Sequence, residues 1–401
     1  MNDPSHAPTA ATPAVPNLRV TFWGVQGSCP IFPTHDEVIE YAERLASATI
    51  EKAMMDLAGR LERGQCTPEQ LRAMATPEKA AEYQQHLGLP DLPIYGGDTT
   101  CIEIVTADGD TLLFDMGTGM RDFSKQATKH WAGRRDRTIH IFASHEHLDH
   151  RSGLPFSSFC FDKENPFTVH VYGTRQFLTA LDDRYGIYSH KLTPFMHVDD
   201  PLDYRMIAAK FTGSEIRTSL SAGDIRPPFS GKVRHVGEPI AVGNTTVTPF
   251  EVYHGITQCL AYKVRHGNST FVFCTDHELR HGADPADERQ LRSLAAERRL
   301  VEQCRDVDVA YFDGQYLLAE YAGQEGIGGG PAVGRMDWGH SCIEDVVARV
   351  AQCGIRRAFI GHHDPERLWG ERVEIDQRLK QLCEGKPYQI HLAKSGGSIV
   401  L

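Results

Sequence analysis

The first apolar period of the chain begins at Leu18, after residues 1–17, which are rich in Pro, Ala and Thr and have no regular apolar spacing. Such a composition buries too little apolar surface to offset chain entropy, so we expect a disordered leader over 1–17. Residues 18–24 then alternate as a half-buried strand does, and glycines and a proline within 24–30 break this strand into a tight loop.

Between residues 36 and 63 the apolar spacing changes to steps of three and four, which is typical of an amphipathic helix. Thr67-Pro-Glu-Gln70 is a capping box with proline at the first helical position, and Thr76-Pro-Glu starts a third helix. We therefore predict a helical insert over about residues 35–92. Three roles are open for it: ordinary packing, a cover over a cleft, or a surface between two chains of a homodimer.

Strand-like runs return after the insert, and helical spacing interrupts them at intervals. We predict strands at 100–105, 111–115, 138–143, 168–172, 246–252, 260–264, 270–274, 307–312, 357–360 and 389–392, and helices at 287–302 and 343–352. The run 138–143 is almost continuously apolar, which favours burial on both faces. This alternation indicates a layered α/β architecture, and we expect residues 18–401 to form one elaborated domain.

Composition narrows the class of protein. The 401 residues are 41% hydrophobic and 24% charged, as in soluble globular proteins. No run approaches the roughly 18 apolar residues of a membrane span, and the start has no signal-peptide pattern, so we expect a cytoplasmic protein without a membrane partner. The ten cysteines include no CxxC pair, which argues against a zinc ribbon or a disulfide framework and favours buried thiols.

The strongest chemical signal directly follows the run 138–143. His145, His147, Asp149 and His150 lie within six positions. In this HxHxDH spacing the first two histidines can face one way and the last two residues the other, so one loop could serve two metal ions. A solvated His-rich loop is the alternative, but chance rarely places four potential ligands at the end of a core strand.

Further potential ligands follow three later predicted strands, namely His254, Asp276 and His362. Each residue alone would more often be a surface loop residue than a ligand. Together they could complete a dinuclear site at one sheet edge, where layered α/β folds bind ligands. The adjacent His363 is the nearest rival for the role of His362.

Short motifs along nearly the whole chain, outside the leader and the insert, resemble those of the metallo-β-lactamase superfamily, in particular its ribonuclease Z-like phosphodiesterase branch. The motifs are FWGVQGS at 22–28, YGGDTTC at 95–101, FDMGTG at 114–119, the HxHxDH loop, HG at 254–255, TD at 275–276, DGQY at 313–316, WGHS at 338–341 and HHDP at 362–365. The resemblance implies an αββα sandwich of two mixed sheets flanked by helices, here with a helical insertion.

The resemblance also implies a ligand set. His145, His147 and His254 would hold one metal ion, Asp149, His150 and His362 would hold the other, and Asp276 would bridge them. A hydroxide held between two divalent ions would be the nucleophile, since a catalytic zinc ion lowers the pKa of water to about 7. Histidine and aspartate ligands favour zinc, and manganese and iron are compatible.

Two residues are predicted to act in catalysis beyond simple metal binding. The resemblance implies that His340 protonates the leaving oxygen, and Asp149 counts as both ligand and catalytic residue. A supporting or helix-capping role is the alternative for His340. We expect Asp313 to orient His340 or a ligand, and Asp115 to buttress the HxHxDH loop. Departures from the family pattern at Asp98, His277 and Cys342 remove none of these residues.

Four functions fit these residues to different degrees. We predict a metal-dependent phosphodiesterase that cleaves a small anionic phosphodiester, such as a cyclic nucleotide. A metal-dependent acyl hydrolase, such as a lactonase, thioesterase or β-lactamase, is the main alternative. A ribonuclease Z-like enzyme is less favoured, because no Gly- and Lys-rich arm is present and a net charge of -11 opposes binding of a long nucleic acid. A non-catalytic scaffold would be expected to have lost ligands.

Overall fold

The computed structural model describes residues 17–90, 92–131, 136–192, 202–221 and 229–401. Nearly all of the predicted leader, residues 1–16, lies outside this range. The chain divides into a larger unit, Met1–Ile31 with Tyr95–Leu401, and a smaller unit, Phe32–Ile94. Among the described residues, none of the helices is both long and apolar enough to cross a membrane.

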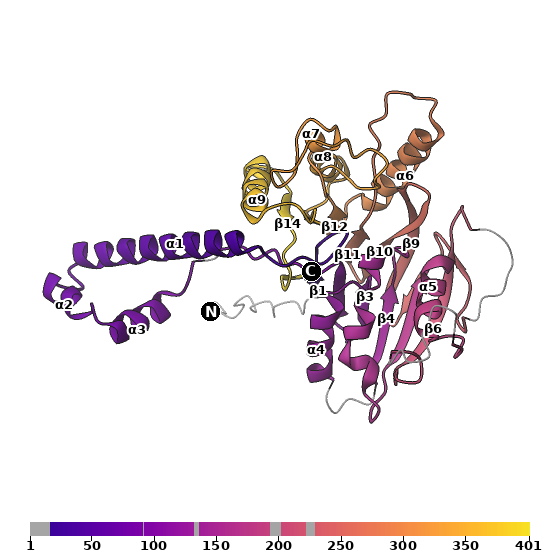
Figure 1. The fold of residues 1–401 in the computed structure, drawn as a ribbon, viewed down its shortest axis with the longest axis horizontal. Helices are drawn as coiled ribbons and strands as arrows, with labels where there is room; N and C mark the ends of the chain where they lie inside the picture. The colour runs from indigo at the N-terminus through magenta and orange to yellow at the C-terminus, as the bar shows by residue number, and fades with distance from the viewer. Residues whose placement is uncertain (1–16, 91, 132–135, 193–201, 222–228) are drawn as a thin grey trace, which may run out of the picture. The chain divides into compact units, whose positions relative to one another are not determined.

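Two mixed sheets form the centre of the larger unit (Figure 1). The first sheet has the strand order β15 (Ser398–Val400), β1 (Leu18–Gly24), β2 (Cys101–Thr106), β3 (Thr111–Phe114), β4 (Thr138–Phe142), β5 (Thr168–Gly173), β6 (Lys210–Arg217) and β7 (Arg234–His235). The second has the order β14 (Gln389–Leu392), β13 (Arg357–Gly361), β12 (Val309–Asp313), β11 (Ser269–Cys274), β10 (Thr257–His266), β9 (Thr245–His254) and β8 (Ile240–Val242). Strands β3 to β7 and β11 to β14 run parallel, and the remaining pairs are antiparallel.

The sheets pack face to face through apolar side chains of both. Phe114 on β3 contacts Phe273 on β11 with ring centres 5.2 Å apart, and both belong to one buried cluster. Helices α4 (Met120–His130) and α5 (Arg175–Tyr185) cover the first sheet, and α6 (Glu288–Cys304), α8 (Ile343–Cys353) and α9 (Trp369–Cys383) pack on the second. The predicted αββα sandwich is therefore confirmed.

The predicted strands and the helices at 287–302 and 343–352 form close to their expected bounds. The expectation of burial on both faces of 138–143 is wrong, because only one face of β4 is buried along its length. Thr138 and His140 stay half-buried, and the His140 ring stacks on His170 of β5 at 5.0 Å. On this face of β4 the two histidine rings therefore lie where the sequence predicted a fully buried apolar surface.

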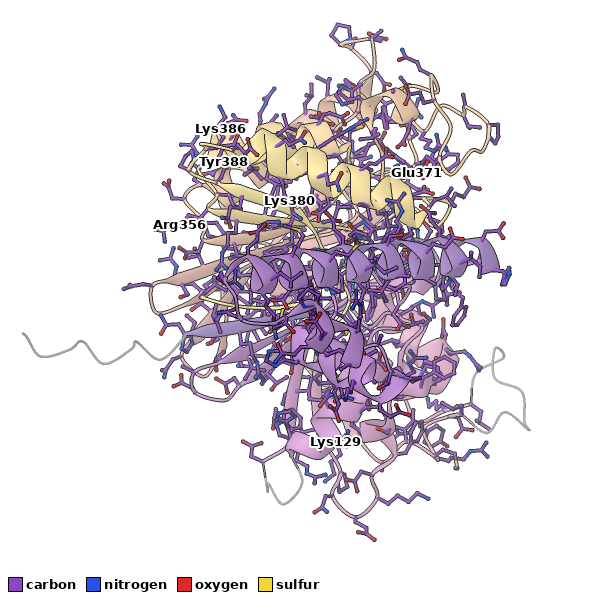
Figure 2. All side chains as sticks on the ribbon, turned by 90° about the vertical axis from the view of Figure 1, so that its left-hand side faces the viewer. Lys129, Arg356, Glu371, Lys380, Lys386 and Tyr388 are labelled. Carbon is purple, nitrogen blue, oxygen red and sulfur yellow. The ribbon has the colours of Figure 1, made fainter. Side chains whose placement is uncertain are left out.

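Helices α4, α5 and α9 were not predicted. Helix α5 nevertheless has clear ends, because the Thr174 side chain accepts a hydrogen bond from the Phe177 backbone N–H and Gly186 ends the helix in the left-handed region. Helix α9 carries Glu371 in its first turn and Lys380 in its last (Figure 2). A negative charge at the N-terminus and a positive charge at the C-terminus interact favourably with the helix dipole and stabilise the helix.

The smaller unit contains the helices predicted for the insert: α1 (His35–Glu62), α2 (Pro68–Ala73) and α3 (Pro77–Leu87). The Tyr83 hydroxyl joins α3 to α1 by donating a hydrogen bond to Asp56 over 2.6 Å. None of the three helices contains a buried residue. Ile50 and Met54 are 59% and 66% exposed, so the apolar positions of α1 do not form a core.

Candidate metal centre

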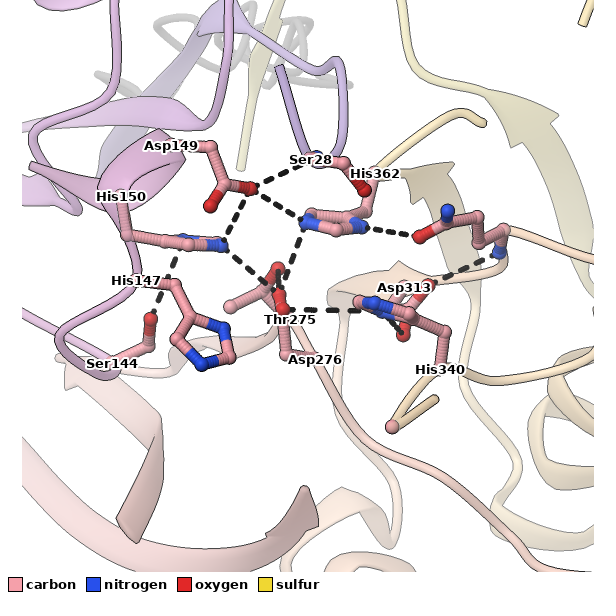
Figure 3. A network of polar contacts seen from close by, with 12 residues as sticks. Ser28, Ser144, His147, Asp149, His150, Thr275, Asp276, Asp313, His340 and His362 are labelled. Atoms are coloured by element: carbon pink, nitrogen blue, oxygen red, sulfur yellow. Dashed lines mark hydrogen bonds and ion pairs between the residues drawn. The ribbon is translucent and has the colours of Figure 1, made fainter. Parts of the chain in front are cut away.

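The candidate site is built at the ends of strands from both sheets. His145, His147, Asp149 and His150 follow β4, and the last two lie in the short 3₁₀ helix Leu148–His150. From the second sheet, His254 ends β9, Asp276 follows β11 and His362 follows β13. The fold thereby brings all seven predicted ligand residues together from segments far apart in the sequence. Figure 3 shows five of them, namely His147, Asp149, His150, Asp276 and His362.

Their potential ligand atoms form two groups that meet at Asp276. Oδ2 of Asp276 lies 3.5 Å from His145 Nε2 and 3.7 Å from His254 Nε2. Oδ1 of the same carboxylate lies 3.2 Å from the Nε2 atoms of both His150 and His362. Each oxygen thus faces a different group of histidines, as a ligand shared between two ions would.

Asp149 and His147 complete the two groups. Asp149 Oδ2 lies 3.1 Å from His150 Nε2 and 3.3 Å from His362 Nε2, and it accepts a hydrogen bond from the Ser28 backbone N–H. His147 lies beside His254 with ring centres 4.9 Å apart, and it is the exposed member of its group. The exposed imidazole marks the side from which the cluster can be reached.

Unpaired ring nitrogens indicate that this cluster fits metal ions. Nε2 of His145 and Nε2 of His150 are both buried, and neither forms a hydrogen bond among the described residues, although carboxylate oxygens of Asp149 and Asp276 approach His150 Nε2 to 3.1 and 3.2 Å. An unpaired buried polar atom is costly, so such atoms call for a ligand in native proteins. A cluster of imidazole and carboxylate donors suits a divalent transition metal.

Hydrogen bonds at the far side of three rings direct Nε2 toward the cluster. His254 Nδ1 donates to the carbonyl oxygen of Gly339 over 2.9 Å, and His362 Nδ1 donates to Gln315 Oε1 over 3.0 Å. His150 Nδ1 lies 2.7 Å from Asp115 Oδ2. Because oxygen acceptors hold the proton on Nδ1, the lone pair of Nε2 is left for a metal ion.

Asp115 binds Ser144, the residue directly before the HxHxDH loop. Its Oδ1 accepts a hydrogen bond from the Ser144 backbone N–H over 2.7 Å, and its Oδ2 accepts one from the Ser144 hydroxyl over 2.8 Å. The residue is fully buried, and its contacts are those expected of a buttress.

The charges of the site match a cation. Burial alone would raise the pKa of Asp276, but the neighbouring His362 and His150 imidazoles hold it well below its usual value. Burial lowers the pKa of His145, and it lowers that of His254 to about 4. Ionised carboxylates and neutral imidazoles are the protonation states that metal binding requires. Burial alone would lower the pKa of His150, but the Asp149 and Asp276 carboxylates raise it well above its usual value, so this imidazole would release its proton when a metal ion binds.

His340 lies beside the cluster, just before α8. Its ring stacks on His362 with centres 4.7 Å apart, and its Nδ1 lies 3.2 Å from Asp313 Oδ2. Burial alone would lower the pKa of His340, but the Asp313 carboxylate, followed by Asp276, raises it to about 9. One potential ligand atom from each of His340, Asp276 and His362 also lies within 4.8 Å of the other two. His363 turns away and contacts the Ala393 carbonyl oxygen at 2.9 Å.

Two contributing residues were not identified from the sequence. Gln315 contacts His362 and lies in the quoted DGQY motif, but that motif alone assigned it no role. Glu278, two positions after Asp276, is fully buried and accepts hydrogen bonds from the backbone N–H groups of Asp337 (2.8 Å) and Gly339 (3.1 Å). Its place two residues after Asp276, within a run of polar and charged residues, was the available sequence signal for Glu278.

Comparisons with known proteins agree with this architecture. The sequence profile described as Beta-lactamase superfamily domain matches residues 110–363. Among solved structures, unliganded yeast PDE1 is similar with a TM-score of 0.54 and 14% identity, covering 96% of this chain and 100% of PDE1. The metallo-β-lactamase fold protein YhfI from Bacillus subtilis is similar with a TM-score of 0.50 and 12% identity, covering 96% and 100%. At these identities the likeness concerns the fold. No curated protein matches the chain in sequence.

Proposed function

The chain belongs to the metallo-β-lactamase superfamily, and on this premise we propose that it is a phosphodiesterase that uses two divalent metal ions to cleave a small phosphodiester such as a cyclic nucleotide. Members of this superfamily are metal-dependent hydrolases. The proposal adds the number of ions, the phosphodiester substrate and the roles of individual residues.

The two groups of donors support a pair of ions. His145, His147 and His254 would hold one, Asp149, His150 and His362 would hold the other, and Asp276 would contact both. When bound, such ions neutralise the nonbridging phosphate oxygens and lower the pKa of water. Zinc suits these nitrogen and oxygen donors best, and manganese and iron are also compatible.

The observation that carries the phosphodiester assignment is the pair of His340 and Asp313. Asp313 contacts Nδ1 of His340, which also lies 3.8 Å from Asp276 Oδ2, so the proton on Nε2 would be the one available to a leaving oxygen. Against the opposing effect of burial, the Asp313 carboxylate raises the pKa of His340, which favours the protonated imidazole that a general acid requires. Expulsion of an alkoxide is aided by such a positioned acid.

The net charge supports a small substrate. A chain of charge -11 repels a long polyanion, whereas a single phosphodiester would meet mainly the local cationic centre. An acyl hydrolase is the second candidate, because the cluster of donors by itself suits a carbonyl substrate as well.

A substrate panel tests the proposal. Purified protein is assayed with bis-p-nitrophenyl phosphate, p-nitrophenyl acetate, a γ-lactone and a β-lactam, before and after chelation. We expect metal-dependent turnover of the phosphodiester that exceeds turnover of the three acyl substrates. Turnover of an acyl substrate alone would replace the phosphodiesterase with the second candidate.

A further inference from the structure

We propose that Trp338 forms the surface on which the base of a nucleotide substrate stacks. The inference rests on the proposed phosphodiesterase function, and it specifies the group that is attached to the phosphate. It is argued from the position of the indole, from what holds the indole in place and from its exposed surface.

Trp338 lies close to the proposed acid. The Tyr316 ring packs edge-on against Trp338, with centres 6.5 Å apart, and edge-on against His340, with centres 6.0 Å apart. The indole and the imidazole therefore border the same phenol ring. A nucleobase is separated from its cyclic phosphate by one ribose, so a base on Trp338 would leave the phosphate near His340.

The indole is fixed from one side. The Arg335 guanidinium lies 5.8 Å from the centre of the Trp338 ring and 5.3 Å from that of Tyr316. Arg335 is buried, and its Nη1 donates hydrogen bonds to the carbonyl oxygens of Glu320 (3.0 Å) and Val333 (2.9 Å). A cation held in this way favours one orientation of the aromatic ring.

The backbone around Trp338 is fixed as well. Glu278 accepts hydrogen bonds from the N–H groups of Asp337 and Gly339, the two neighbours of Trp338 in the chain. A single carboxylate thus holds both sides of the tryptophan turn. A site that is already ordered loses less entropy when a ligand binds.

Exposed apolar side chains lie close in sequence to the proposed ligands and the proposed acid. Trp338 is 54% exposed, and Leu148 and Ile256, each within two residues of a proposed ligand, are 65% and 92% exposed. A single exposed tryptophan is ordinary, but this one packs against the buried Arg335 and Tyr316, and Tyr316 also packs against the proposed acid. Flat aromatic surfaces stack on nucleobases without a strong preference among the bases.

The experiment compares two substrates that differ only in the base: 3′,5′-cyclic AMP and methyl ribofuranoside 3′,5′-cyclic phosphate. We expect kcat/KM to favour cyclic AMP by about 5- to 100-fold in the wild-type protein, the range of measured stacking contributions. Trp338→Ala should reduce this preference to nearly one, mainly through KM, and Trp338→Phe should retain part of it. Leu382→Ala on α9, which removes an apolar side chain of similar exposure (57%), is the control and should retain the full preference.

A binding measurement separates this inference from the proposed function. Adenosine monophosphate should quench tryptophan fluorescence of the wild-type protein more than ribose 5-phosphate does, and Trp338→Phe should abolish this difference. If neither the cyclic phosphates nor bis-p-nitrophenyl phosphate are hydrolysed, the proposed function fails, while selective quenching would still support stacking on Trp338. Equal quenching by both phosphates, or an unchanged preference for cyclic AMP in Trp338→Ala, would overturn the inference.

Discussion

The carbonyl oxygen of Gly339 accepts a hydrogen bond from Nδ1 of His254 over 2.9 Å. This contact joins the loop of the proposed acid to one of the proposed metal ligands. Gly339 has a φ of 92°, and a Cβ atom at this position would collide with the His254 ring. The orientation of the His254 ring therefore depends on a glycine at position 339.

Gly339→Ala should displace His254 and weaken the metal site that His145, His147 and His254 would form. Loss of the partner that orients a histidine ligand typically lowers metal affinity by about 10- to 100-fold. Competition with a chromophoric chelator measures the affinity. The same affinity in the variant and the wild type would show that the Gly339 contact does not orient His254.

Asp276→Ala should lose bound metal and activity together, because one carboxylate faces both groups of histidines. Elemental analysis of the purified variant measures the metal content, and Asp276→Asn, which retains one oxygen acceptor, is the matched control. A fully loaded Asp276→Ala protein would contradict the bridging role.

His340→Gln should retain its metal ions but turn over substrates more slowly. The loss should reach about 10²- to 10⁴-fold for alkyl leaving groups, the usual range for general acid catalysis, and be small for p-nitrophenolate. The dependence of kcat/KM on leaving-group pKa should therefore steepen. A uniform loss across leaving groups would indicate a structural role.

Glu297 ties the loop after β11 to the helical layer. It pairs with Arg349 through two hydrogen bonds of 2.8 and 2.7 Å, and it contacts His277 Nε2 at 2.8 Å. Burial alone would raise the pKa of Glu297, but Arg349 and His277 outweigh burial and lower it. The carboxylate thus contributes stability above its unfolded-state pKa of about 4.3, and this contribution is lost as the pH falls toward the lower folded-state pKa.

Glu297→Gln leaves the Arg349 charge buried without its partner, which should lower the free energy of unfolding at pH 7 by about 3–5 kcal/mol. Urea unfolding of variant and wild type measures the difference. The difference should shrink as the pH is lowered below about 4.3, because only the wild type then loses an ionised group. A difference that stays constant down to pH 3 would contradict the pairing.

The site was predictable from sequence where chemistry and strand ends coincide. His145 to His150 follow an apolar run, and His254, Asp276 and His362 follow others, so periodicity alone placed them at strand ends. Glu278 and Gln315 could not be assigned in this way, because their roles depend on contacts with residues 61 and 47 positions away in the chain.

The helices and the insert show a similar limit. Helix α9 has few apolar positions on one stripe, and its burial comes from packing on β14, which periodicity does not reveal. The insert helices were predictable from the capping sequences at Thr67 and Thr76. The burial of apolar positions such as Ile50 could not be predicted, since it depends on a partner surface that the sequence does not show.

The most direct test of the central claim is a titration of chelated protein with zinc, in which the rate of bis-p-nitrophenyl phosphate hydrolysis is followed against the ions bound per chain. The proposed dinuclear phosphodiesterase predicts little turnover at one ion and a maximum at two. Full activity at one ion, or no hydrolysis at any loading with zinc, manganese or iron, would contradict it.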